Sequence, residues 1–87
     1  MALSFPNQSR SFDVTRQAVR FWGYENAMEA SFFISVGALR RLEPGTALDE
    51  ENLLRVFDHH RDLIYSTAAK VFARGYRGSY DLCTLDF

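Results

Sequence analysis

The sequence has little of several residue types, and each scarcity narrows the class of protein. Cys83 is the only cysteine among 87 residues, so no disulfide bond can form within the chain. No apolar run approaches the roughly 20 residues that span a bilayer. The first residues lack the basic and long apolar regions of a secretory signal. We therefore predict a cytoplasmic protein with no membrane partner.

Neither sign of charge predominates in the chain as a whole. The formal net charge is −1 and the isoelectric point is near 6.1, which excludes a strong overall attraction to nucleic acid or to an anionic membrane. The charges are nevertheless unevenly placed. Residues 1–41 carry five arginines against three carboxylates, whereas residues 42–62 carry six carboxylates against two arginines. Nine of the ten basic residues are arginine, which we attribute to genome composition rather than to phosphate recognition.

Aromatic residues are plentiful. They make up 15% of the chain and include eight phenylalanines. A domain of this size buries only about 60% of the surface that its unfolded chain exposes, so it needs a dense core. Each buried ring removes about 150 to 250 Å² from water. We expect a single domain, residues 1–87, with a core made mainly of aromatic side chains.

The clearest local pattern predicts a β-hairpin. Apolar and polar residues alternate over 17–22 and again over 27–34, as in strands with one buried face. Gly23 and Asn26 tolerate the positive φ values of tight turns, so we place the loop at 23–26. The residues predicted to face the core are Val19, Phe21, Met28, Ala30, Phe32 and Ile34.

Two helices are predicted after the hairpin. Ser35 is placed to cap a short helix, which ends at Pro44. A long helix is predicted from Asp49 to Gly75, with acidic residues in its first turn and basic residues in its last, as the helix dipole favours. Its apolar stripe consists of Leu53, Phe57, Ile64, Ala68, Val71 and Phe72.

The order of elements predicts an α+β fold. Leu3 and Phe5 indicate a short edge strand or an extended arm, and residues 79–87 favour a final strand beside the hairpin. The expected architecture is a small antiparallel β-sheet, made of the N-terminal strands, the hairpin and the C-terminal strand. A short and a long α-helix cover one face of it. The opposite face of the sheet is then left uncovered.

Residues with catalytic or metal-binding chemistry do not form a recognisable pattern. His59 and His60 point about 100° apart on a helix, whereas paired metal ligands share one face. Asp58 and Asp62 have helical spacing but no further convergent ligand. Cys83 lies in a predicted apolar strand, where a thiol is usually inert packing. We therefore expect no enzyme activity, no metal site and no cofactor.

The uncovered sheet face is the first candidate for function. Exposed aromatic and arginine side chains are typical of the centres of protein interfaces. The alternative is that the N-terminal segment, with Leu3, Phe5 and Phe12, folds back and buries this face within the monomer. The first interpretation predicts a homodimer or a complex with another protein. Its interface residues are Arg20, Trp22, Glu29 and Phe33.

Nucleic-acid binding is the alternative function. Arg16, Arg20, Arg40 and Arg41 would contact phosphates, and Trp22 would stack on a base, as aromatic residues do on other sheet platforms. The near-neutral net charge and the acidic start of the long helix count against it.

The chain resembles a family of short bacterial proteins known as domain of unknown function 1488, or Shew3726-like. The resemblance spans nearly the full length and implies a shared fold without an established activity, ligand or catalytic residue. It depends on Phe5-Pro6, Val19-Arg20-Phe21 before Gly23, Phe33-Ile34-Ser35 leading into Ala38-Leu39, and Phe57 with Arg61 and Ile64.

Overall fold

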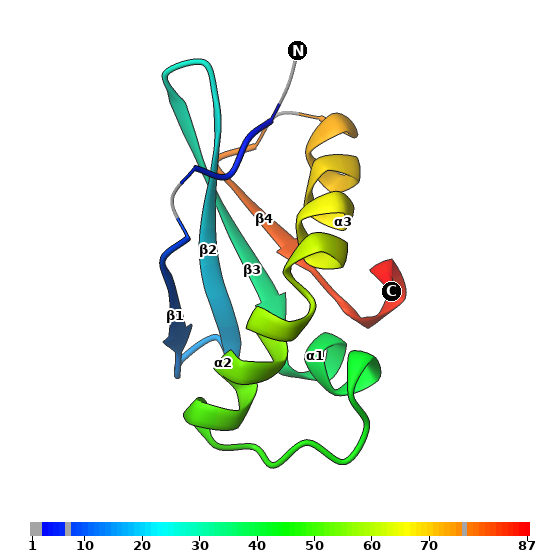
Figure 1. Cartoon of the computed structure of the whole chain (residues 1–87). Helices are drawn as coiled ribbons and strands as arrows, with labels where there is room; N and C mark the ends of the chain where they lie inside the picture. Colours follow the sequence, from blue (N-terminus) through cyan, green and yellow to red (C-terminus); the bar gives the residue numbers. More distant parts are fainter. Residues whose placement is uncertain (1–2, 7, 76) are drawn as a thin grey trace.

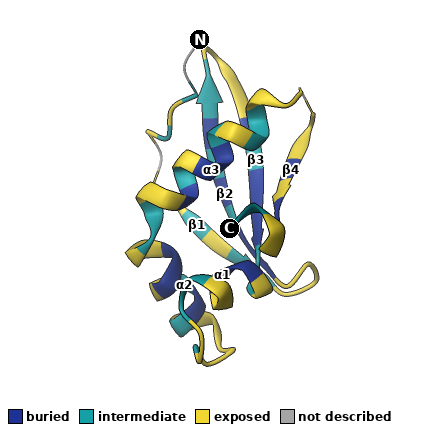
Figure 2. Ribbon diagram, turned by 90° about the vertical axis from the view of Figure 1, so that its right-hand side faces the viewer, coloured by how far each residue is buried: buried dark blue, intermediate teal, exposed yellow. Residues whose placement is uncertain are grey.

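The computed structural model describes residues 3–6, 8–75 and 77–87. These residues form a four-stranded sheet and three α-helices, joined by turns and loops (Figure 1). The strands lie in the order β1-β2-β3-β4. The helices cover one face of the sheet (Figure 2), so the predicted α+β class is confirmed. The elements are β1 (Arg10–Asp13), β2 (Ala18–Glu25), β3 (Met28–Ser35), α1 (Val36–Leu42), α2 (Glu50–His59), α3 (Arg61–Ala73), β4 (Ser79–Leu82) and a 3-10 turn at Thr84–Asp86.

The predicted hairpin is present, with a shorter loop than expected. Strands β2 and β3 pair in antiparallel register from Ala18↔Ser35 to Glu25↔Met28, which leaves a two-residue turn. Asn26 adopts the left-handed conformation there, with φ of 57°. Gly23 lies inside β2 and not in the loop. A Cβ atom at Gly23 would lie 2.8 Å from Phe5 Cε1, so the glycine leaves room for the N-terminal arm to cross the sheet.

The last strand runs in the opposite sense to the one expected. β4 pairs with β3 in parallel, with Ser31↔Ser79 and Ile34↔Leu82 at the ends of the register, so the sheet is mixed. The reason is the connection, because the chain leaves β3, passes through all three helices on one face and re-enters alongside it. Parallel neighbours require such a crossover.

The predicted long helix at 49–75 is two helices. The helical conformation stops at His60, where φ is −117° and ψ is 24°. Glu43, at the end of α1, holds this break, since its Oε2 lies 3.3 Å from His59 Nδ1 and 3.0 Å from His60 Nε2. Partial burial raises the pKa of Glu43, but the hydrogen bonds with the two histidines outweigh burial and leave that pKa lowered. A single intervening residue keeps the apolar stripe in phase, so its spacing did not reveal the break.

The core between sheet and helices is not mainly aromatic, contrary to the prediction, because only four of its 14 buried residues in the described part of the chain carry rings and the other ten are aliphatic. The four rings are nevertheless among its largest fully buried side chains. Three buried rings come from three neighbouring strands, namely Phe21 in β2, Phe32 in β3 and Tyr80 in β4. The ring centroid of Phe32 lies 5.3 Å from that of Phe21 and 5.1 Å from that of Tyr80. Phe57 from α2 adds a ring 5.1 Å from that of Phe21. Ser35 caps α1 as expected, because its Oγ accepts a hydrogen bond from the N–H of Ala38 at 3.0 Å.

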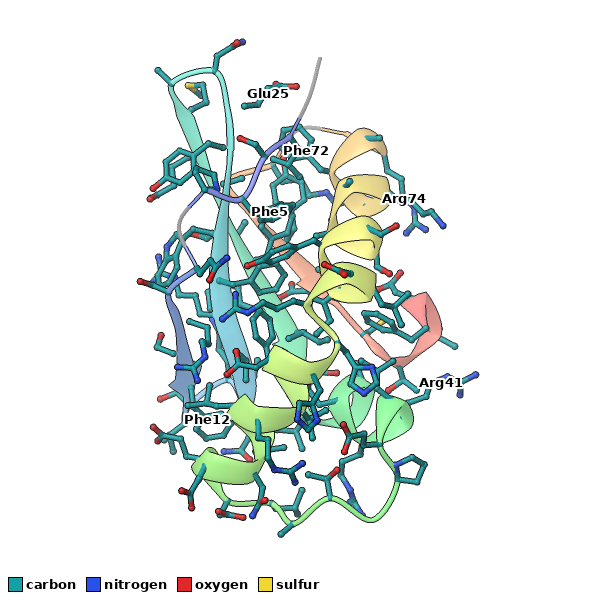
Figure 3. The ribbon with its side chains drawn as sticks, viewed as in Figure 1. Phe5, Phe12, Glu25, Arg41, Phe72 and Arg74 are labelled. Atoms are coloured by element: carbon teal, nitrogen blue, oxygen red, sulfur yellow. The ribbon has the colours of Figure 1, made fainter. Side chains whose placement is uncertain are left out.

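The N-terminal arm packs on the helix side of the sheet. Ser4 pairs with Tyr24 through two backbone hydrogen bonds of 2.8 Å. The ring of Phe5 stacks on Tyr65 of α3, with centroids 4.1 Å apart. Figure 3 shows Phe5 and Phe72 in the layer between the sheet and α3.

A network of charged groups joins β1 to the helices. Arg10 binds the carboxylate of Asp58 through two hydrogen bonds, of 3.0 and 2.8 Å. Arg61 donates to Asp58 Oδ1 at 2.8 Å, to the backbone oxygen of Gln8 at 2.9 Å and to the hydroxyl of Tyr65 at 2.6 Å. Forked pairs of this kind are stronger than single-point ion pairs.

Acid is expected to destabilise the protein through Asp58. The hydrogen bonds from Arg10 lower the pKa of Asp58 in the folded state, and the charge of Arg61 adds to that lowering. A carboxylate with a lowered folded-state pKa contributes stability above its unfolded value and loses that contribution as pH falls through the folded one. Urea unfolding should therefore show the free energy of unfolding falling below about pH 4. Asp58→Asn should reduce that fall and lower stability at pH 7; an unchanged acid dependence would contradict the assignment.

Candidate functional site

The candidate site is the face of the sheet that points away from the helices, which we call the open sheet face. Alternation along paired strands assigns its side chains. Arg20 lies opposite Phe33, and Tyr24 lies opposite Glu29. All four residues predicted as an interface therefore lie on this one face. Its side chains from the strands include Ala18, Arg20, Trp22, Tyr24, Glu29, Ser31, Phe33, Ser79 and Asp81.

Arginine side chains cover the aromatic ring at the centre of this face. The guanidinium carbon of Arg16 lies 4.1 Å from the ring centroid of Phe33, and that of Arg20 lies 5.6 Å away. Phe33 is consequently only 7% exposed. The prediction that Phe33 is an exposed ring was wrong in this respect, because sequence alternation gives the face and not what lies over it.

Arg20 lies between the aromatic rings of Trp22 and Phe33. Its guanidinium carbon lies 5.0 Å from the ring centroid of Trp22, and Nη2 donates to Ser31 Oγ at 3.1 Å. Its Nε is buried and has no hydrogen-bond partner within the described residues. On the same face, the hydroxyl of Tyr24 donates to Glu29 Oε2 at 2.8 Å.

Within its described residues, 3–6 and 8–13, the N-terminal segment does not cover the open sheet face. Phe5 contacts the ring of Phe21, which belongs to the core, and that of Tyr65, which packs against the core. Phe12 in β1 lies opposite the buried Val19 and therefore shares its face. The alternative in which this segment buries Trp22 and Phe33 is thus wrong. The physical reason is that Gly23 opens the path of the arm on the helix side.

The arginines considered for nucleic-acid binding lie on two different elements. Arg20 is in the sheet and Arg16 is in the turn before it, whereas Arg40 and Arg41 are in the last turn of α1. Figure 3 shows Arg41 pointing away from the body of the protein. The open sheet face also carries carboxylates, including Glu29, which oppose phosphate.

A pocket of about 280 Å³ opens on this face beside Phe33. Arg16 and Asp81 lie across it, with Nη1 and Oδ1 3.7 Å apart. Cys83 is exposed at its rim, just after β4, so the prediction of a packed thiol inside a strand was wrong. The lining residues are Arg16, Ala18, Phe33, Ser35, Asp81, Leu82 and Cys83.

Sequence reasoning missed Arg16 and Asp81 as partners. Arg16 was considered only for nucleic acid, and the register of the last strand was not assigned. Phe33↔Asp81 pairing, which brings the carboxylate to the aromatic ring, depends on the parallel crossover. No local pattern in residues 79–87 carries that information.

Within residues 3–6, 8–75 and 77–87, no three His, Cys, Asp or Glu side chains are grouped so that they could hold a metal ion. In that same part of the chain, no helix has the length and apolar character needed to cross a membrane.

Comparison with known proteins gives the family of the chain. A family model described as "Protein of unknown function (DUF1488)" matches residues 3–83. The fold is similar to the crystal structure of a protein of unknown function from the DUF1488 family of Shewanella loihica PV-4, with 22% identity, a TM-score of 0.81 and coverage of 92% of this chain and 90% of that chain. No curated protein matches the chain. Because the family match spans most of the sequence, the chain belongs to the DUF1488 family of proteins of unknown function.

Proposed function

We propose that this protein is a non-catalytic assembly module whose open sheet face binds a second copy of the same chain. The observation that carries the proposal is the layer of arginine and aromatic side chains on a sheet face that none of the helices in the described part of the chain covers. Arginine and tryptophan are the residues most enriched at the energetic centres of interfaces. Here Arg20 and Trp22 are neighbours on the same face of β2, one of the two central strands.

Charge on the open sheet face supports a second copy as the partner. The face combines the cations Arg16 and Arg20 with the carboxylates of Glu29 and Asp81. A two-fold axis places the same surface on both sides, so every cation can meet a carboxylate of the other copy. A nucleic acid would meet those carboxylates with its phosphates, which is unfavourable.

The size of the face predicts a weak dimer. Neighbouring strands lie about 4.8 Å apart, and each strand rises about 3.3 Å per residue. A sheet of four strands with up to eight residues each therefore has a flat area on the order of 500 Å². A standard interface buries about 800 Å² from each partner. We therefore expect a dissociation constant of the dimer on the order of micromolar, so that the fraction of dimer depends on protein concentration.

Light scattering behind size-exclusion chromatography tests the proposal. The wild-type protein should pass from monomer to dimer as its concentration rises, and Trp22→Ala should remain monomeric at each concentration. Leu63→Ala is the matched control, because Leu63 is an exposed apolar residue on the outer side of α3. Glu29→Arg, an exposed position on the same face, provides a second variant in case Trp22→Ala folds poorly; circular dichroism checks folding.

Each outcome decides between the proposed functions. Loss of the dimer in Trp22→Ala and Glu29→Arg, with Leu63→Ala unchanged, supports the open sheet face as the interface. A dimer that persists in both variants would place the interface elsewhere. A wild-type chain that stays monomeric would refute self-association, and salt-dependent binding of a single-stranded oligonucleotide would then favour the nucleic-acid role.

A further inference from the structure

We propose that the pocket beside Phe33 is a binding site for an arginine side chain, and that in the dimer each copy inserts its Arg16 into the pocket of the other. The inference rests on the proposed self-association and names the contact that would fix its register. It also assigns a role to the pocket, of whose lining only Phe33 belongs to the predicted interface residues.

The pocket has the parts that a planar cation needs. The ring of Phe33 offers an aromatic face, the carboxylate of Asp81 offers a negative charge at its side, and Ala18 and Leu82 supply apolar walls. Within one chain this site already holds an arginine, since Arg16 lies 4.1 Å from the ring centroid and 3.7 Å from Asp81 Oδ1. Guanidinium groups are suited to stacking and ion pairing at once.

The contact within one chain is loosely held. The side chain of Arg16 is 49% exposed and that of Asp81 is 75% exposed, and such ion pairs contribute little to stability. Arg16 lies in the turn between β1 and β2, where its backbone N–H donates to Asp13 Oδ1 at 3.0 Å. The backbone of the turn is thus fixed while the side chain can leave the pocket.

Exchange between two copies keeps every contact and strengthens it. A two-fold axis that moves Arg16 into the partner copy's pocket moves the second Arg16 into the first, so no pocket is left empty. The same ion pair and the same cation–π contact are then enclosed by both sheet faces. Removal of water strengthens both interactions.

Mixing two charge-reversed variants tests the exchange. Arg16→Glu places two carboxylates at the pocket, and Asp81→Arg places two cations there. Each variant alone should self-associate at least about tenfold more weakly than the wild type. Mixed in equal amounts, they restore opposite charges only between chains, so heterodimer should form within about threefold of the wild-type affinity. Arg41→Glu is the matched control, because Arg41 is an exposed arginine on α1 away from the pocket.

The readout is sedimentation velocity with one variant fluorescently labelled. Recovery of the dimer in the mixture, with the control unchanged, supports the exchange. Variants that dimerise like the wild type, or a mixture that stays monomeric while the wild type dimerises, would overturn the exchange and leave the assembly itself intact. A monomeric wild type would overturn the assembly proposal as well, so the two failures are distinguishable.

Discussion

Phe32→Ala is expected to remove about 4 kcal/mol of stability, whereas Phe33→Ala, one residue further on, should remove less than half as much. Phe32 is completely buried, and its ring centroid lies 5.8 Å from that of Phe5, 5.3 Å from that of Phe21 and 5.1 Å from that of Tyr80. Losing such a ring leaves a cavity that rigid neighbours cannot fill. An 87-residue domain has about 4 to 13 kcal/mol in total, so Phe32→Ala should be about half unfolded at the lower end of that range.

The neighbouring position serves as the control. Phe33 points to the opposite face and is covered by the flexible side chains of Arg16 and Arg20, which can collapse into the space that the ring leaves. Urea unfolding at low protein concentration, where the chain is monomeric, measures both variants. Equal losses would show that the open sheet face is as tightly packed as the core, against the structure described above.

Arg61→Ala is expected to lower the free energy of unfolding by about 2 kcal/mol. The guanidinium of Arg61 donates hydrogen bonds to the carboxylate of Asp58, the backbone oxygen of Gln8 and the hydroxyl of Tyr65. Its carbon also lies 5.0 Å from the ring centroid of Phe57. It therefore ties the N-terminal arm, α2 and α3 together. Its removal takes this donor away from the backbone oxygen of Gln8 and the hydroxyl of Tyr65, while Asp58 keeps the hydrogen bonds from Arg10.

Lysine should not replace this arginine. Arg61→Lys keeps the charge but has no planar fork, so it should recover less than half of the loss. Thermal unfolding of the wild type and of both variants gives the comparison. Hydrogen exchange should show the added opening at the Ser4 and Tyr24 amides, which bridge the arm to β2. Full rescue by lysine would mean that charge alone, and not the forked geometry, holds the network.

Local patterns predicted those parts of the fold that depend on neighbouring residues. Alternation along the hairpin assigned Phe32 to the core and Trp22 to the open face, because the pleat alone determines sides. The cap at Ser35 was likewise readable, since a hydroxyl before a helix has one usual partner. The predicted interface residues were placed on a common face by the same argument; whether that face binds a partner stays a prediction.

Features that depend on distant residues were not predictable in this way. The break at His60 is held by Glu43, 17 residues earlier, and it leaves the apolar stripe in phase. The direction of β4 follows from the path of three helices and not from residues 79–82. Asp81 can therefore be assigned to the candidate site only from the parallel register of β3 and β4. Arg16 lies in a turn, which has no periodic pattern, so the sequence did not indicate that its side chain lies over the ring of Phe33.

Fluorescence of Trp22 at increasing protein concentration measures whether the open sheet face becomes buried when the dimer forms. Trp22 is the single tryptophan and lies on the open sheet face, so its emission reports on that face alone. As the dimer forms, the emission should shift to shorter wavelength and iodide quenching should weaken, with the same midpoint as the rise in mass. Emission and quenching that stay constant while the mass doubles, or a mass that never doubles, would contradict self-association through the open sheet face.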